Sequence, residues 1–204
     1  MVSLFRAHPA SERGFSLIEM MLVVAIIGVL TAITVPMSSN ALRYLKLSGD
    51  ARNLSNASAV TKMRAAAKFT QARLYIDITG RAFYAQTYDK VTETWVDEGG
   101  ATQLSSTVSF SHGPVTSPPP NTQTTIGPAP ACMNTASPPV AVANTACIIF
   151  NSRGLPVDNT GSPTGMDAVY VTDGTAVYGV TVAATGFVRL WRNEYSSTPA
   201  WSLQ

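Results

Sequence analysis

Glu19 is the only charged residue between Phe15 and Pro36, in a segment built otherwise from apolar and small side chains. A carboxylate in lipid costs about 2.5–3.5 kcal/mol at the centre of a helix and less near its end, so it usually has a partner and a role. If the chain were cut just before Phe15, the cut would create an α-amine on Phe15, one helical turn from Glu19. That amine on one copy of the chain could pair with Glu19 of a neighbouring copy. The alternative is an ordinary charge near the membrane surface, tolerated because its side chain reaches toward water.

Gly14 is a candidate cleavage site on the N-terminal side of the apolar run. An ordinary secretory signal carries its small-residue site after the apolar stretch, whereas Gly14 stands before it, directly after Arg13. Cleavage at Gly14 would leave the apolar helix on the mature chain. Arg6 and Arg13 precede the run and no basic residue follows until Arg43, so the positive-inside bias predicts a cytoplasmic N-terminus with the rest outside.

The run Gly14-Phe15-Ser16-Leu17-Ile18-Glu19, with Pro36 further along, resembles the N-terminus of type IV pilins and type II secretion pseudopilins. The resemblance implies that residues 1–14 are a leader, that prepilin peptidase cuts after Gly14, and that Phe15 is N-methylated. It implies that Glu19 sets the register of assembly and that Pro36 kinks the helix. The implied partners are other pilins or pseudopilins and an inner-membrane assembly platform. The implied location is the bacterial inner membrane, with the C-terminal domain in the periplasm and the chain incorporated into a pilus or pseudopilus.

A long helix followed by a β-rich domain would position these residues. The segment 15–37 is long enough, at about 1.5 Å per residue, to cross a bilayer core. Residues 38–72 continue it as an amphipathic helix, whose buried face is predicted from three- and four-residue steps to hold Leu47, Ala51, Leu54, Ser58, Thr61, Ala65, Phe69 and Ala72. The period then changes to two, so 73–204 is predicted to be β-rich, with a Pro-rich loop at about 113–146. The expected class is α+β, a pilin fold in which the helix packs on an antiparallel sheet or sandwich.

A second resemblance extends into the β-rich part. The segments MRAAA (63–67), FNSRGLP (150–156) and TGFVRL (185–190), with a hairpin between the first two, are similar to the GspH/FimT-like minor pilin domain. The resemblance implies an initiation or tip component of a type IV pilus or type II secretion pseudopilus. A few members bind DNA for natural transformation through a Gly-Arg-x-Arg element. Here Phe187 replaces the first of these arginines, and a DNA-binding minor pilin is the alternative function.

Arg189, Trp191 and Arg192 are the candidate DNA contacts. Arginines can contact phosphates while an aromatic ring stacks on a base. The competing interpretation is an edge strand with protective charges and a half-buried tryptophan. The formal net charge of +2 over 204 residues favours that interpretation over a general polyanion binder.

Residues for other chemistry are few. His8 and His112 are the two histidines, which is a poor basis for a hydrolytic triad or a zinc site. No Gly-rich phosphate loop followed by lysine is present. We therefore expect neither catalysis nor a cofactor. Asp158 and Asp167 are candidate calcium ligands, although their spacing does not match an EF-hand and polar turns are commonly only turns.

Cys132 and Cys147 are the two cysteines, and neither has a second Cys or His at metal-ligand spacing. If the chain leaves the cytoplasm, a disulfide that closes the Pro-rich loop is the natural prediction. Two free thiols are the alternative.

Overall fold

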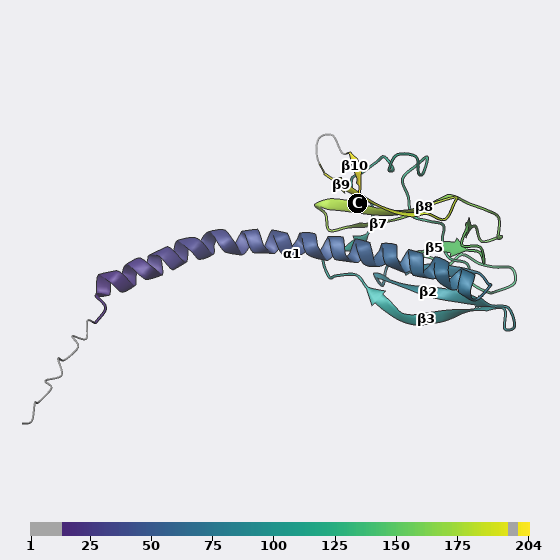
Figure 1. The fold of residues 1–204 in the computed structure, drawn as a ribbon, viewed down its shortest axis with the longest axis horizontal. Coiled ribbons are helices and arrows are strands. Elements are labelled where there is room, and N and C mark those ends of the chain that lie inside the picture. The colour runs from purple at the N-terminus through teal and green to yellow at the C-terminus, as the bar shows by residue number, and fades with distance from the viewer. Residues whose placement is uncertain (1–13, 196–199) are drawn as a thin grey trace, which may run out of the picture. The chain divides into compact units, whose positions relative to one another are not determined.

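The computed structural model describes residues 14–195 and 200–204, without the side chains of 35–37. Most of the predicted leader, including Arg6, His8 and Arg13, therefore lies outside the described residues. The chain divides into two units, one ending at Leu42 and the other spanning Arg43–Gln204. One long helix, α1 (Leu17–Ala67), contributes to both, and ten strands follow it in the described residues (Figure 1).

The first unit is the apolar part of α1. The Ser16 carbonyl accepts a hydrogen bond from the Glu19 amide at 3.0 Å, so the helix begins directly after Ser16. The hydroxyls of Thr31 and Thr34 donate to backbone carbonyls four residues earlier at 2.9 Å, which satisfies both polar groups inside the helix. The described side chains from 14 to 34 are exposed. An 18-residue window of α1 has a mean hydropathy of 2.5, so the helix is long and apolar enough to cross a membrane.

In the second unit, α1 buries the face that the sequence predicts, up to its last turn. Six of the eight predicted residues are buried within the helix: Leu47, Ala51, Leu54, Ser58, Thr61 and Ala65. The predicted end at residue 72 is wrong, because α1 ends at Ala67. Phe69 takes a left-handed φ of 51°, and the Thr70 amide donates to the Ala65 carbonyl at 3.2 Å, as in a Schellman cap. Phe69 is consequently 76% exposed, and Ala72 begins the first strand instead.

The strands form two five-stranded antiparallel sheets. The first sheet has the order β3 (Thr94–Gln103), β2 (Ala82–Asp89), β1 (Ala72–Asp77), β5 (Thr145–Phe150) and β6 (Pro156–Val157). The second sheet has the order β10 (Trp201–Leu203), β9 (Val188–Glu194), β8 (Ala176–Ala183), β7 (Met166–Thr172) and β4 (Ser109–Phe110).

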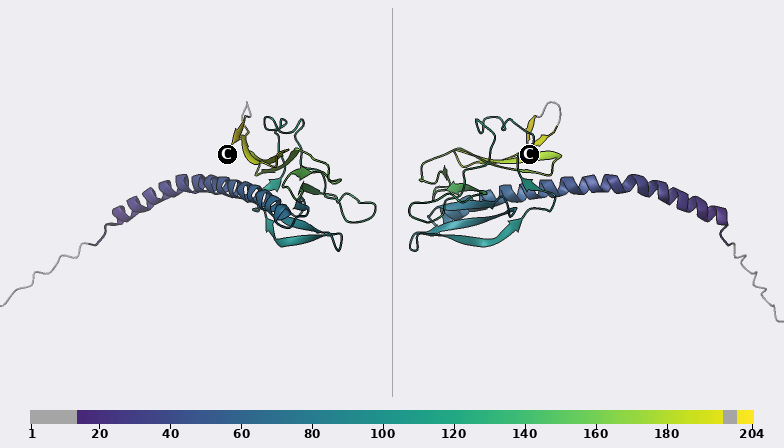
Figure 2. Two further views of the ribbon diagram at one scale, coloured as in Figure 1. Left: turned by 45° about the vertical axis from the view of Figure 1, so that its right-hand side comes forward. Right: turned by 180° about the vertical axis from the view of Figure 1, so that it is seen from behind.

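A single core joins residues 43–67 of α1 to both sheets. Leu54 of α1, Phe83 of the first sheet and Tyr178 of the second belong to the same buried cluster. Figure 1 shows β2 and β3 on one side of this half of α1 and β7 and β8 on the other, and the views in Figure 2 agree. The prediction of an α+β fold, in which a long helix packs on antiparallel sheets, is confirmed.

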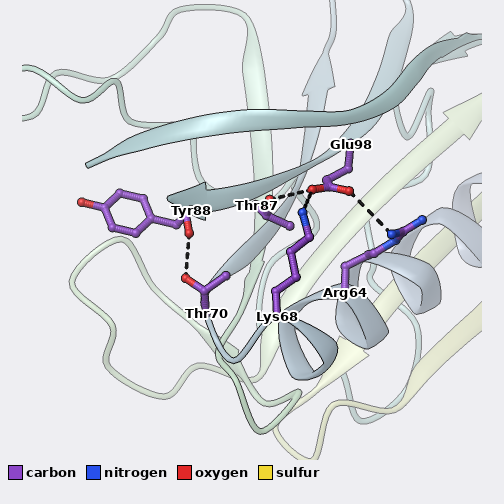
Figure 3. A network of polar contacts seen from close by, with 6 residues as sticks. All are labelled: Arg64, Lys68, Thr70, Thr87, Tyr88 and Glu98. Carbon is purple, nitrogen blue, oxygen red and sulfur yellow. Dashed lines mark hydrogen bonds and ion pairs between the residues drawn. The ribbon is translucent and has the colours of Figure 1, made fainter. Parts of the chain in front are cut away.

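Polar contacts fix the end of α1 to the edge of the first sheet (Figure 3). Glu98 of β3 forms ion pairs with Lys68 and with Arg64, the latter at 3.6 Å, and accepts a hydrogen bond from the Thr87 hydroxyl at 2.9 Å. The hydrogen bond from Lys68 holds the pKa of Glu98 below its usual value. Because cations favour the C-terminus of a helix, this network stabilises the helix end as well as its docking.

Candidate functional site at the N-terminal segment

Gly14 and Phe15 form an accessible peptide bond just before α1. Both residues lie outside the helix, and the Phe15 side chain is 79% exposed. No described atom lies within 4 Å of the position that a Cβ on Gly14 would occupy. An exposed, non-helical bond of this kind is open to a peptidase.

Glu19 lies in the first turn of α1, where the helix dipole favours a negative charge. Its carboxylate has no hydrogen bond or ion pair with any described residue. The hydroxyls of Thr31 and Thr34, in contrast, are satisfied within the helix. Glu19 is therefore the one charge of the described apolar segment, and no residue among 14–195 and 200–204 pairs with it.

Residues 9–35 match a family described as the prokaryotic N-terminal methylation motif. The match includes Gly14, Phe15 and Glu19. The N-terminal segment of this chain is therefore similar to that of proteins that carry this methylation motif.

Two solved structures are similar to this chain at low identity. One is a structure of the minor pseudopilin EpsH from the type 2 secretion system of Vibrio cholerae, with a TM-score of 0.36 and 9% identity over 78% of this chain and 96% of that one. The other is a crystal structure of the minor pseudopilin EpsH from the same organism's type II secretion system, with a TM-score of 0.36 and 14% identity over 71% of this chain and 92% of that one. No curated protein matches the chain.

Pro36 lies inside α1, whose helical assignment continues through it. A proline there removes one backbone hydrogen bond. The bend expected at this position stays a prediction.

The predicted disulfide between Cys132 and Cys147 is confirmed. Cys147 lies on β5, and Cys132 lies in the predicted loop, where no named strand occurs between Phe110 and Thr145. Both cysteines are buried with Ile149 in a small cluster apart from the main core. The bridge thus attaches the loop to the outer face of the first sheet.

The three candidate DNA residues do not form one exposed site. Trp191 is 8% exposed and its indole donates to the Thr181 hydroxyl at 3.0 Å, so its ring is not open to a base. Arg192 forms an ion pair with Glu194 at 2.5 Å. Arg189 is exposed. The interpretation of this segment as an edge strand is wrong, because β9 pairs with both β8 and β10.

Arg189 instead shares an open groove with Arg52 of α1. The groove has a volume of about 460 Å³ and is also lined by Ser55 and Asn56. Neither arginine forms an ion pair with a described residue. Sequence patterns did not indicate Arg52, because its proximity to Arg189 depends on packing between distant segments.

The two candidate calcium ligands differ in burial and in their hydrogen bonds. Asp158 accepts a hydrogen bond from the Thr160 hydroxyl at 2.7 Å, and this bond, followed by those from the backbone amides of Ser162 and Thr160 at 2.9 and 2.8 Å, holds its pKa below the usual value. Asp167 of β7 is 7% exposed, and burial raises its pKa to about 6. Among the described residues, no three His, Cys, Asp or Glu side chains are grouped to hold a metal. Asp158 serves as a turn residue.

Sequence reasoning also missed Arg73, a buried cation on β1 that is 5% exposed. Its hydrogen-bond and ring partners come from β2, β3 and the Pro-rich loop. The hairpin turn that contains Gly80 could have indicated that Arg73 faces Gln86 across the strands. No local pattern could have indicated the other partners.

Proposed function

We propose that this chain is a minor pilin or pseudopilin that prepilin peptidase cuts after Gly14 and methylates at Phe15. It assembles as an initiation or tip component of a type IV pilus or a type II secretion pseudopilus. The observation that carries the proposal is Glu19. It is the one charge in an exposed apolar helix, it lacks a partner among the described residues, and it stands one turn after the accessible Gly14–Phe15 bond.

In this proposal, the apolar half of α1 first anchors the subunit in the inner membrane, with residues 43–204 in the periplasm. Cleavage creates an α-amine at Phe15. When the helix leaves lipid for the filament core, the amine of one subunit pairs with Glu19 of its neighbour. A shifted register would leave the carboxylate unpaired among apolar side chains, which costs several kcal/mol. The pair therefore selects the register.

Glu19→Val tests this step. Because the pair is made only between subunits, the variant should be cleaved normally, but its amount in sheared filaments should fall at least about tenfold. Thr31→Val is the matched control, since its hydroxyl is already satisfied within the same helix. Incorporation of Glu19→Val at the wild-type level would refute the register role.

The proposed initiation or tip position has a separate test. A tip component should be present in very few copies per filament, whatever the filament length. Its deletion should reduce the number of filaments rather than their length. Immunogold labelling along the whole filament shaft would contradict the tip position and leave the assembly role intact.

A second candidate function is DNA capture, and the groove between Arg52 and Arg189 is the observation that favours it. Two unpaired arginines can contact successive phosphates, and such binding weakens with salt. The fragment 43–204 should shift duplex DNA in a gel at low salt, and Arg52→Ala with Arg189→Ala should abolish the shift. Arg153→Ala, at an exposed turn, is the control. No shift of the wild-type fragment at low salt would exclude this function.

A further inference from the structure

The outer face of the first sheet carries a polar pocket of about 430 Å³. We call it the Arg73 pocket, and its lining includes Gln71, Arg73, Glu93, Thr94, Trp95 and Asn134. Its volume lies in the range of small-ligand sites. Residues of β1, β2, β3 and β5 line it, together with residues of the loop that the disulfide attaches. The lining lies between residues 71 and 159 and includes none of the N-terminal segment.

Arg73 is held rigidly in this pocket. Its Nε donates to the Gln86 side-chain oxygen at 2.6 Å, and its Nη1 donates to the Met133 carbonyl at 2.8 Å. Its guanidinium carbon lies 4.2 Å from the centre of the Trp95 ring. These contacts fix the plane of the guanidinium before any ligand arrives, which lowers the entropy lost on binding.

The charge of Arg73 lacks a direct counter-charge. No carboxylate among the described residues lies within ion-pair distance. Arg73 is connected to a carboxylate only indirectly, through Gln86, whose side-chain amide donates a hydrogen bond to Asp97 at 2.7 Å. Burial lowers the pKa of Arg73 to about 10, so the side chain stays charged at neutral pH. A buried cation of this kind is costly unless an anion compensates it.

One edge of the guanidinium is left for a ligand. Nη2 makes no hydrogen bond with a described residue, and Nη1 uses one of its two protons on Met133. The two terminal nitrogens of arginine match the two oxygens of a carboxylate or a phosphate. Glu93 also lines the pocket and opposes a doubly charged ligand. A carboxylate, with a single charge, fits better than a phosphate.

We propose that the Arg73 pocket binds a carboxylate, held end-on by the two terminal nitrogens of Arg73 beside Trp95. The side-chain amides of Gln71 and Asn134 and the Thr94 hydroxyl favour an oxygen-rich ligand around that group. Two sources share this chemistry: a free small acid such as a uronate, and an acidic side chain on a peptide.

The experiment titrates the full chain in detergent micelles and follows intrinsic fluorescence, because Trp95 contacts Arg73. The probes are glucuronate and a doubly capped Gly-Glu-Gly peptide. Their neutral analogues are glucose and capped Gly-Gln-Gly. A saturable change with one carboxylate probe and none with its analogue is expected, and the responding probe identifies the source. No saturable change with either carboxylate, or an equal response to the neutral analogue, would overturn the proposal.

Three variants locate the binding. Arg73→Gln should weaken it at least about tenfold, because a charge-assisted hydrogen bond is lost. Arg81→Gln is the matched control on the same sheet, since this arginine also donates to a carbonyl but lies at the hairpin turn. Glu93→Gln, at an exposed position, should tighten binding about two- to fivefold at low salt by removing a like charge. If Arg73→Gln does not fold, the Glu93→Gln result still decides: unchanged affinity would overturn the proposal.

Discussion

At the scale of single residues, the surroundings of two carboxylates, Asp167 and Asp89, shift their pKa values in opposite directions. Asp167 is buried without a hydrogen bond or ion pair from a described residue, so burial, followed by repulsion from Asp158, raises its pKa to about 6. Asp89 lies at a turn, where backbone amides of Val91 and Thr92 lower its pKa. The same side chain thus opposes folding at one position and favours it at the other.

Asp167→Asn should raise the free energy of unfolding at pH 7.5 by about 1–3 kcal/mol. The pKa of Asp167 in the folded chain lies above the reference value of 3.8. The free-energy cost of burying its charge is therefore absent below pH 3.8, grows as the pH rises toward about 6, and is fully present above pH 6. Urea unfolding of the fragment 43–204 across this range should show the wild type losing stability relative to the variant as pH rises.

Asp89→Asn is the control of opposite sign. Its carboxylate has a lowered pKa, so it stabilises the fold above the unfolded pKa and loses that contribution as pH falls through the folded pKa. A stability difference between Asp167→Asn and wild type that is independent of pH would contradict the assignment of Asp167.

At the scale of elements, α1 ends in a left-handed backbone conformation that its sequence does not predict. Helices that end in a left-handed residue usually place glycine there. Here Phe69 takes that position with φ of 51°, and Lys90 donates to its carbonyl at 2.8 Å. Tertiary contacts such as those of Glu98 with Lys68 hold the helix end against the sheet and so impose the left-handed turn.

Phe69→Gly should raise the free energy of unfolding by about 0.5–1 kcal/mol, because glycine adopts a positive φ without the steric cost. Little packing is lost, since Phe69 is 76% exposed. Phe69→Ala is the matched control, as it removes the ring but keeps the Cβ that causes the strain, and it should give no gain. Equal effects of the two substitutions would show that the ring, not the backbone, matters.

Periodicity predicted the face of α1 through Ala65 and the hairpin of β1 and β2, because both follow from spacing along one segment. It failed at Phe69, where the helix stops without glycine or proline. The edge-strand interpretation of residues 188–194 failed for another reason, because alternation along one strand does not indicate that β10 pairs with β9. Gly14, Phe15 and Glu19 were predictable because their roles depend on order and spacing. Arg52 and Arg73 were not, since their neighbours come from distant parts of the chain.

At the scale of the whole molecule, the two units are stable in different surroundings. The apolar part of α1 is exposed over residues 14–34 and requires a surrounding apolar phase, first lipid and then, in our proposal, neighbouring helices. Residues 43–204 have their own core, and the disulfide attaches the long loop to it. The second unit is thus built to remain folded while the environment of the first unit changes.

Replacing both cysteines, as Cys132→Ser with Cys147→Ser, should lower the free energy of unfolding of the fragment 43–204. The cysteines are 15 residues apart in sequence, and closing a loop of that size is worth about 3 kcal/mol. Urea unfolding of the variant, with reduced wild-type fragment as the control, should give the same loss in both. No loss in either would show that the loop is held by its packing alone.

The intact mass of the chain purified from its native cells tests the central claim most directly. We expect a chain that begins at Phe15 and carries one added methyl group, and we expect Gly14→Ala to accumulate with its leader attached. A wild-type chain that keeps residues 1–14, or a Gly14→Ala variant with the same mature mass as wild type, would contradict the account.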